Sequence, residues 1–186
     1  HLHISLQSGS KNVLRRMGRG HYDPGVLHGF CRSLRSAFPR YGLGADVLSG
    51  FPGETEADAS ETETFCAELP FTYAHVFPYS RRPGTPAAAW PDQVGEDVKK
   101  DRAARLRALF SARKETFLQN CLDLPVVHVA LEGGEHAANG APTGVNEFYA
   151  DCVFAPGFAP DGSRHRRLVA AKPLAVDNGR LTVAAV

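Results

Sequence analysis

The sequence lacks long apolar runs and closely spaced cysteines. No apolar stretch approaches the roughly 20 residues of a membrane-spanning helix, and no signal peptide is visible. The four cysteines lie far apart, with no Cys-x-x-Cys pair, at positions Cys31, Cys66, Cys121 and Cys152. This spacing disfavours a metal knuckle or a disulfide framework. It favours a reducing compartment and therefore a cytoplasmic location, without a membrane partner.

An excess of charge is also missing. The 186 residues contain 21 Lys and Arg against 20 Asp and Glu, so the net charge of +1 gives no reason to expect a polyanionic partner. With 43% hydrophobic residues the chain can bury a core. It has no initiating methionine and opens directly in the alternating pattern His1–Gln7. This start favours a fragment of a longer protein, whose preceding half would be a missing partner.

Three strand–helix units are predicted in the first two thirds of the chain. The strands are expected at residues 1–7, 43–49 and 71–79, and the principal helices at 23–38, 56–69 and 92–120. Strands that alternate with helices imply right-handed crossovers and a parallel sheet. Three units make half of a barrel. The predicted fold class is therefore α/β, a partial parallel (half TIM-like) barrel, followed by a small antiparallel β-barrel.

The predicted helices have start signals and apolar faces. Asp23 followed by Pro24 predicts a helix start, and Thr55 with Asp58 three residues later resembles a capping box. The first of these helices should face inward with Leu27, Phe30, Cys31, Leu34, Ala37 and Phe38. The second should expose an acidic face of Glu56, Asp58, Glu61, Glu63 and Glu68.

The last third of the chain reads as all-β. Short strands are expected at residues 126–131, 147–154, 167–173 and 181–186, with residues 133–144 as a loop. Asn178–Gly179 is a strong signal for a hairpin turn. This pattern predicts the antiparallel barrel.

The segment Asp-Val-Leu-Ser-Gly-Phe-Pro-Gly-Glu-Thr, residues 46–55, reads as a strand end, a tight turn and a helix start. Gly50 and Gly53 allow backbone conformations closed to other residues and a close approach by a ligand. Polar groups also follow the other two strands, at Gln7–Ser10 and Tyr79–Thr85. Because the carboxyl ends of parallel strands meet at one face, these three loops predict a ligand site.

No nucleophile–base pair stands out, so no catalytic residue and no metal ligand is predicted. His1 and His3 share one face of the first strand, where a polar sheet face is a simpler explanation than a metal site.

Four motifs resemble one enzyme family. They are Leu-Gln-Ser-Gly-Ser (6–10), Val-Leu-Arg-Arg-Met-Gly-Arg (13–19), Gly-Phe-Pro-Gly-Glu-Thr (50–55) and Phe-Pro-Tyr-Ser-Arg-Arg-Pro-Gly-Thr-Pro-Ala (77–87). In order and spacing they resemble the second half of the radical S-adenosylmethionine methylthiotransferases over residues 1–122. The resemblance implies that residues 1–122 are the C-terminal half of a radical S-adenosylmethionine α/β barrel. It also implies S-adenosylmethionine and two [4Fe-4S] clusters as cofactors.

Within the family, the run from His75 to Tyr79 and the basic Arg82 look most like the branch that modifies N6-threonylcarbamoyladenosine beside the tRNA anticodon. The implied reaction adds a methylthio group to C2 of that adenosine. Two alternatives stay open: a non-catalytic RNA- or protein-binding module, and a methylthiotransferase that acts on a ribosomal protein.

The resemblance also implies site residues. Contacts to S-adenosylmethionine would come from Gln7, Ser8 and Arg19, although Arg19 also reads as an exposed helix end. The adenine would pack against Gly50, Phe51, Pro52, Gly53 and the strand around Phe77, with Glu54 fixing the turn. Tyr79, Ser80 and Arg82 would face substrate or cluster.

The chain departs from the family pattern in its cysteines. The Cys-x-x-x-Cys-x-x-Cys motif and the second cysteine set, which lie upstream in the family, are absent. The chain alone should therefore bind no iron and be inactive. An open sheet edge should favour self-association.

Residues 125–186 lie where the family carries a small tRNA-binding β domain called TRAM. With five basic and six acidic residues after Leu124, this segment is not basic. Arg164, Arg166 and Arg167, near Phe148 and Tyr149, are predicted to form a modest RNA-binding patch. A structural remnant with a charged loop is the alternative.

Overall fold

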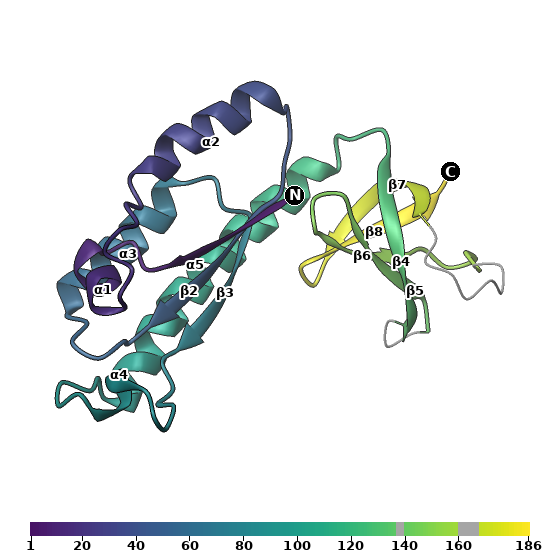
Figure 1. The fold of residues 1–186 in the computed structure, drawn as a ribbon. Helices are drawn as coiled ribbons and strands as arrows, with labels where there is room; N and C mark the ends of the chain where they lie inside the picture. The colour runs from purple at the N-terminus through teal and green to yellow at the C-terminus, as the bar shows by residue number, and fades with distance from the viewer. Residues whose placement is uncertain (137–139, 160–167) are drawn as a thin grey trace. The chain divides into compact units, whose positions relative to one another are not determined.

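The computed structural model describes residues 1–136, 140–159 and 168–186 (Figure 1). The chain divides into two compact units, and the boundary falls within the long helix α5 (Glu96–Cys121). Residues Leu2–Ser111 form what we call the sheet unit. Residues Ala112–Val186, together with His1, form the barrel unit. No helix in the described ranges is both long enough and apolar enough to cross a membrane.

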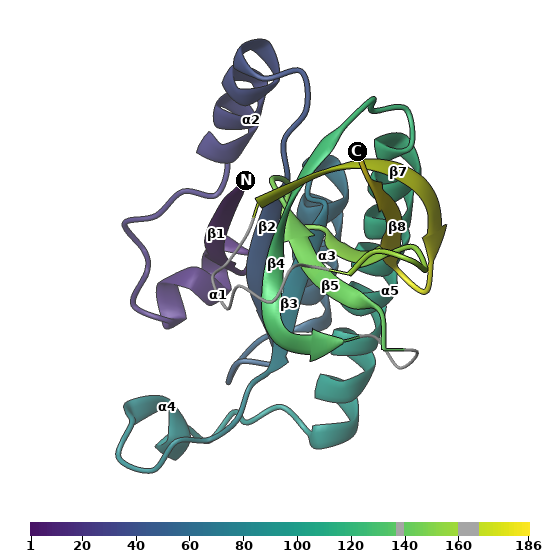
Figure 2. The same ribbon diagram turned by 90° about the vertical axis from the view of Figure 1, so that its right-hand side faces the viewer.

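The sheet unit is built on three parallel strands in the order β1 (Leu2–Gln7), β2 (Leu43–Ser49) and β3 (Tyr73–Pro78). The first residues of β1 and β2 pair as Leu2 with Leu43, and those of β2 and β3 as Gly44 with Tyr73. Figure 2 shows the three strands side by side. The predicted α/β fold class is confirmed.

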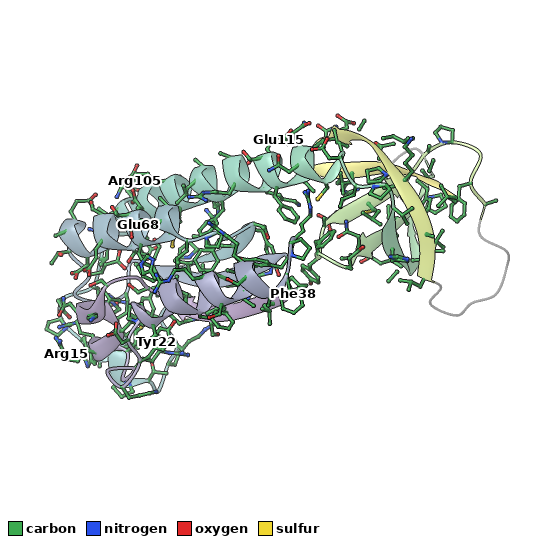
Figure 3. The ribbon with its side chains drawn as sticks, turned by 90° about the horizontal axis from the view of Figure 1, so that it is seen from above. Arg15, Tyr22, Phe38, Glu68, Arg105 and Glu115 are labelled. Atoms are coloured by element: carbon green, nitrogen blue, oxygen red, sulfur yellow. The ribbon has the colours of Figure 1, made fainter. Side chains whose placement is uncertain are left out.

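Three helices cover one face of this sheet: α2 (Val26–Ala37), α3 (Glu56–Glu68) and α5. Two shorter helices, α1 (Lys11–Arg16) and α4 (Pro86–Ala89), follow β1 and β3. The shared core contains Leu6, Val47 and Val76 from the strands and Leu27, Cys66 and Phe110 from the helices. Figure 3 shows α5, which carries Arg105, running beside α3, which carries Glu68. The opposite sheet face exposes polar and aromatic side chains, among them His75 and Phe77.

Helix α2 differs from its prediction at its start and on one flank. It begins at Val26 rather than at Pro24, because the Asp23 carboxylate accepts a hydrogen bond from the Gly25 N–H and closes a turn first. Leu27, Cys31 and Leu34 are buried as predicted. Phe30 and Phe38, however, are 41% and 53% exposed. Their positions satisfy helical spacing, but the sheet contacts only a narrow stripe of the helix.

The N-terminus of α3 has the predicted capping box. The Thr55 hydroxyl accepts from the Asp58 N–H at 3.1 Å, and the Asp58 carboxylate accepts from the Thr55 N–H at 2.9 Å. The prediction that Asp58 lies on the exposed acidic face is wrong, because this side chain is only 7% exposed.

The barrel unit contains a closed five-stranded barrel in the order β4-β5-β6-β8-β7. The strands are β4 (Val127–His136), β5 (Pro142–Asn146), β6 (Asp151–Phe154), β7 (Leu168–Asp177) and β8 (Arg180–Ala185). Four pairings are antiparallel, but β6 and β8 are parallel, so the barrel is mixed rather than wholly antiparallel. Closure joins every strand to two neighbours.

Two details of the barrel were predicted differently. Strand β4 continues to His136 and pairs with Pro142 of β5, so part of the expected loop 133–144 is strand. The expected strand 147–154 is interrupted, because the Asn146 side-chain oxygen accepts from the N–H groups of Phe148 and Ala150 and closes a turn. The Asn178–Gly179 hairpin is confirmed, with φ of 49° and 69° at the two positions and Asp177 paired with Arg180.

Candidate functional site at the carboxyl edge of the sheet

The carboxyl ends of β1, β2 and β3 lie along one edge of the sheet. Gln7 pairs with Val47 near the end of β2, and the Tyr79 N–H donates to the Ser49 carbonyl at 2.8 Å. The expected convergence of Gln7, Gly50 and Tyr79 at one edge is therefore present. Gln7 itself has a φ of 66°, so the chain turns sharply as it leaves β1.

The turn after β2 depends on its two glycines. Gly50 and Gly53 have φ of 74° and 81°, a region that favours glycine. A Cβ at Gly50 would overlap the Lys99 side chain, and a Cβ at Gly53 would overlap that of Arg16. The close approach that these glycines permit is therefore used by the protein's own side chains.

A buried ion pair holds this turn from the helix side. The Glu54 carboxylate accepts from the Gly50 N–H at 3.0 and 3.1 Å and from Arg102 Nη1 at 3.0 Å. Arg102 also donates to the Glu54 carbonyl. The Glu54 side chain is 5% exposed and that of Arg102 is 7% exposed. Burial raises the pKa of the Glu54 carboxyl, and the hydrogen bond from Gly50 and the charge of Arg102 counter only part of that rise. Glu54 thus fixes the turn, as the sequence led us to expect.

A second buried network fixes the loop after β1. The Ser8 and Thr62 hydroxyls lie 3.0 Å apart, and the Ser10 hydroxyl donates to Asp58 Oδ1 at 2.7 Å. Asn12 donates to both oxygens of the same carboxylate at 3.3 Å. Burial raises the pKa of Asp58, but the hydrogen bonds from Thr55, Ser10 and Asn12 outweigh it and hold the pKa below the ordinary value.

Asp58 therefore fixes the loop after β1, whereas the sequence placed it only in a cap and on an exposed acidic face. The Thr55–Asp58 spacing gave the capping box, but nothing in the sequence indicated that Ser10 and Asn12 would meet the same carboxylate.

An aromatic cluster packs between the turn and the segment after β3. The Phe51 ring lies edge-on to Tyr79 and Trp90, at centroid distances of 5.3 and 5.7 Å. The Arg16 guanidinium lies 5.0 Å from the Trp90 ring and donates to the Pro52 carbonyl at 2.9 Å. The Tyr79 side chain is 8% exposed, and its hydroxyl has no hydrogen-bond partner within the described residues. An orphaned buried hydroxyl at this edge is suited to a polar ligand group.

The structure separates the predicted site residues into three groups by burial. Six of them are buried at the edge: Ser8, Gly50, Phe51, Pro52, Glu54 and Tyr79. Gln7 and Gly53 are half-buried. The exposed residues are Arg19, Phe77, Ser80 and Arg82. Phe77 lies on the open sheet face rather than on the turn. Arg164, Arg166 and Arg167 lie outside the described residues.

The open sheet face holds a polar cluster that the sequence reasoning did not assemble. His3 lies 3.0 Å from Asp46 through Nε2 and 3.0 Å from the Tyr73 hydroxyl through Nδ1. The His75 ring lies 5.5 Å from that of His3. The alternation of strand 1–7 could have placed His3 on this face, but the partners depend on strand order.

No family model matches the chain. Several hundred curated proteins match it, among them the three that follow. The chain is 50% identical over 109 residues to the threonylcarbamoyladenosine tRNA methylthiotransferase MtaB of Bacillus subtilis (strain 168). The aligned residues make up 59% of this chain and 24% of that protein. The chain is 46% identical over 107 residues to the protein of the same name from Rickettsia prowazekii (strain Madrid E), covering 58% and 25%.

The third relative is the tRNA-2-methylthio-N(6)-dimethylallyladenosine synthase of Acidothermus cellulolyticus (strain ATCC 43068 / DSM 8971 / 11B). It is 51% identical over 108 residues, covering 58% of this chain and 22% of that protein. The chain is homologous to the tRNA methylthiotransferases. The resemblance drawn from the four motifs is thereby confirmed. This methylthiotransferase homologue spans about a quarter of the length of the relatives it matches.

The family resemblance implies S-adenosylmethionine and iron–sulfur clusters, and these two groups fit the described residues differently. The four cysteines are buried, and no three Cys, His, Asp or Glu side chains in the described ranges are placed to hold a metal ion. These residues do not fit a cluster. The orphaned Tyr79 hydroxyl suits a polar group of a ligand, whereas the space over Gly50 and Gly53 is taken by Lys99 and Arg16.

Proposed function

We propose that this chain supplies the nucleoside-binding edge of a tRNA methylthiotransferase, which adds a methylthio group to C2 of an N6-modified adenosine beside the anticodon. The observation that carries the proposal is identity of about half over more than 100 residues to three tRNA methylthiotransferases. The arrangement of three parallel strand ends at one edge supports it. The clusters would be held by residues outside this chain, so the chain alone would be inactive.

S-adenosylmethionine, when bound, supplies the radical and the methyl group of the reaction. In this chain, Gln7, Ser8 and Arg19 would contact its ribose and methionine, and the Gly50–Gly53 turn would border the adenine. The buried position of Ser8 favours a role in shaping the loop, whereas the exposed Arg19 is free to reach a carboxylate. Tyr79, Ser80 and Arg82 would face the substrate.

The branch we favour is the one that modifies threonylcarbamoyladenosine. Its support is the run from His75 to Tyr79 together with Arg82, and two of the three relatives carry that activity in their names. The third relative, at 51% identity, is named for dimethylallyladenosine, so overall identity does not separate the branches. A ribosomal-protein substrate or a non-catalytic binding module would be the alternative.

We assign residues 1–122 to the second half of the radical barrel and residues 125–186 to a TRAM-like RNA-binding domain of a cytoplasmic enzyme. The open edges of β1 and β3, which have no strand partner among the described residues, support pairing with the preceding half of the protein or self-association.

The test uses the natural full-length protein in a bacterial strain that lacks tRNA methylthiolation. Mass spectrometry of digested tRNA should then show 2-methylthio-N6-threonylcarbamoyladenosine. Appearance of the dimethylallyl derivative instead would overturn the branch. Absence of both products, with the protein folded and its clusters loaded, would overturn the function.

A matched pair of variants tests the edge. Tyr79→Phe removes only the orphaned hydroxyl and should raise the apparent KM for the tRNA substrate several-fold. Tyr41→Phe, just before β2, removes another buried hydroxyl without a hydrogen-bond partner among the described residues and should leave KM unchanged. Equal effects of both variants would contradict a ligand role for Tyr79.

A further inference from the structure

The net charge of the chain conceals a strong separation of charge within the sheet unit. Residues 1–45 contain seven Lys and Arg and one Asp, whereas residues 46–80 contain seven Asp and Glu and no Lys or Arg. The basic stretch comprises β1, α1 and α2, and the acidic stretch comprises β2, the glycine turn and α3.

The acidic charges are largely neutralised within the unit. Glu54 pairs with the buried Arg102, and Glu56 and Glu63 pair with Arg105 at 2.6 and 2.8 Å. Asp58 is buried in its hydrogen-bond network. The arginines of α5 therefore cancel much of the charge of α3.

The basic side is not neutralised in this way. Lys11 pairs with Asp23 at 3.1 Å, and Arg16 pairs with Asp92. Arg15, Arg32 and Arg35 are exposed, and no carboxylate of the described residues forms an ion pair with them. Figure 3 shows Arg15 on α1 and Phe38 at the end of α2 on one side of the sheet unit, with Arg105 on the other.

The exposed surface of α2 is suited to close approach by an extended anion. Arg32 and Arg35 are separated by one helical turn and are both exposed. Arg35, four residues after Cys31, flanks the buried stripe of α2. Arg32 borders a shallow hollow whose remaining lining residues are all small: Gly29, Ser33, Ser36 and Ala37. A guanidinium group beside small side chains can donate two parallel hydrogen bonds to one phosphate without steric obstruction.

We propose that Arg15, Arg32 and Arg35, which we call the helical basic surface, bind the phosphate backbone of the RNA substrate. That the partner is RNA rests on the proposed function. It places the main electrostatic contact on α1 and α2 rather than on the barrel, whose described strands carry only Lys172 and Arg180 as basic residues. Such contacts set affinity and register without reading the base sequence.

The experiment compares two triple variants that remove the same charge. The first, helical variant is Arg15→Gln/Arg32→Gln/Arg35→Gln. The second, barrel variant is Arg164→Gln/Arg166→Gln/Arg167→Gln. Binding of the 186-residue chain to an unmodified anticodon stem-loop RNA is measured from 0.05 to 0.3 M KCl. Lys100→Gln on α5 serves as the surface control.

The helical variant should weaken binding roughly 10- to 100-fold at about 0.1 M salt. It should also reduce the slope of log K against log salt by about 2, since each phosphate contact contributes about 0.7 to 0.9. Replacing the same three arginines by lysine should keep most of the slope, which separates charge loss from misfolding. Lys100→Gln should change neither quantity.

A helical variant that binds as tightly as the wild type, or loses less than the barrel variant, would overturn the proposal. So would tighter arginine-dependent binding to phosphatidylserine vesicles than to the RNA. The proposed function is tested separately. If the whole protein modifies no tRNA but the chain still binds RNA through these arginines, only the proposed function is refuted. If tRNA is methylthiolated while the helical variant keeps its RNA affinity and KM, only the proposal for the helical basic surface is refuted.

Discussion

The two units keep their polar groups in different places. In the sheet unit, Glu54, Asp58, Lys99 and Arg102 are all at least nine-tenths buried near the carboxyl edge. In the described part of the barrel unit, the buried polar residues are Thr143 and Asn146, and neither is charged. The barrel satisfies its backbone by closure, because each strand has two neighbours. At the carboxyl ends of the sheet strands, the loops are held by buried charges and hydrogen bonds.

This difference has a functional consequence. A loop held from behind by side chains keeps its outer backbone available to a ligand, at the cost of burying charge. Loops between barrel strands need only a turn, such as the one at Asn178–Gly179. The comparison predicts that mutations of buried polar groups will be most damaging in the sheet unit.

The largest effect is expected for Glu54→Ala. This change leaves the buried Arg102 with only one carboxylate partner, the exposed Glu56, and breaking such a buried pair costs about 3–5 kcal/mol. Urea unfolding followed by the fluorescence of Trp90, the only tryptophan, reports on the sheet unit. Glu61→Ala, on the exposed face of α3, is the control.

The double variant Glu54→Gln/Arg102→Met removes both charges and should recover part of the loss. If Glu54→Ala lies within about 1 kcal/mol of Glu61→Ala, the buried pair does not hold the turn, since surface changes are usually that small.

A smaller effect is expected for Asp58→Ala, which removes the cap and the contacts to Ser10 and Asn12. The free energy of unfolding at pH 7 should fall by about 2 kcal/mol. The folded-state pKa is below the unfolded value, so this stabilisation is fully present above about pH 4 and is lost as the pH falls through the folded pKa.

The wild-type and Asp58→Ala stabilities should therefore converge in acid. Unfolding curves collected between pH 2.5 and 7 check this convergence. A constant difference over that range would show that the carboxylate charge is not what stabilises the loop.

In the barrel, Gly179→Ala should cost about 1 kcal/mol, because its φ of 69° is unfavourable for residues with a Cβ. Burial raises the pKa of the Cys152 thiol to about 12, so alkylation at pH 8 requires the barrel to open. Peptide mass spectrometry should show faster alkylation of Cys152 in this variant, with the Trp90 unfolding midpoint unchanged. Gly95→Ala, where a Cβ would meet open space, should not accelerate it.

The smallest effect concerns α2. Phe38→Ala should change stability by less than about 0.5 kcal/mol because the ring is 53% exposed. Leu34→Ala, at the buried stripe, should cost roughly 2–5 kcal/mol. Chemical denaturation of both variants compares them directly. A large loss for Phe38→Ala would restore the sequence-based expectation that this residue faces inward.

Much of the fold could be predicted because local signals were strong. Periodicity gave the three strands and their helices, and the Thr55–Asp58 and Asn178–Gly179 pairs gave a cap and a hairpin. The errors came where a local pattern meets a limited contact surface. Phe30 fits the helical stripe of α2, but the sheet reaches only its centre. The strand expected at 147–154 is broken by a turn that the Asn146 side chain closes.

By itself, the sequence determined the α/β and β order of the chain, the glycine turn and the methylthiotransferase motifs, because spacing and turn residues act over a few neighbouring positions. Only the tertiary structure decided that Asp58 accepts hydrogen bonds from Ser10 and Asn12 and that Arg102 neutralises Glu54. It also decided that Arg15, Arg32 and Arg35 stay exposed without a carboxylate partner among the described residues. The contacts of Asp58 and Arg102 join residues 46 to 48 positions apart, and burial and charge pairing at that range depend on which elements pack together.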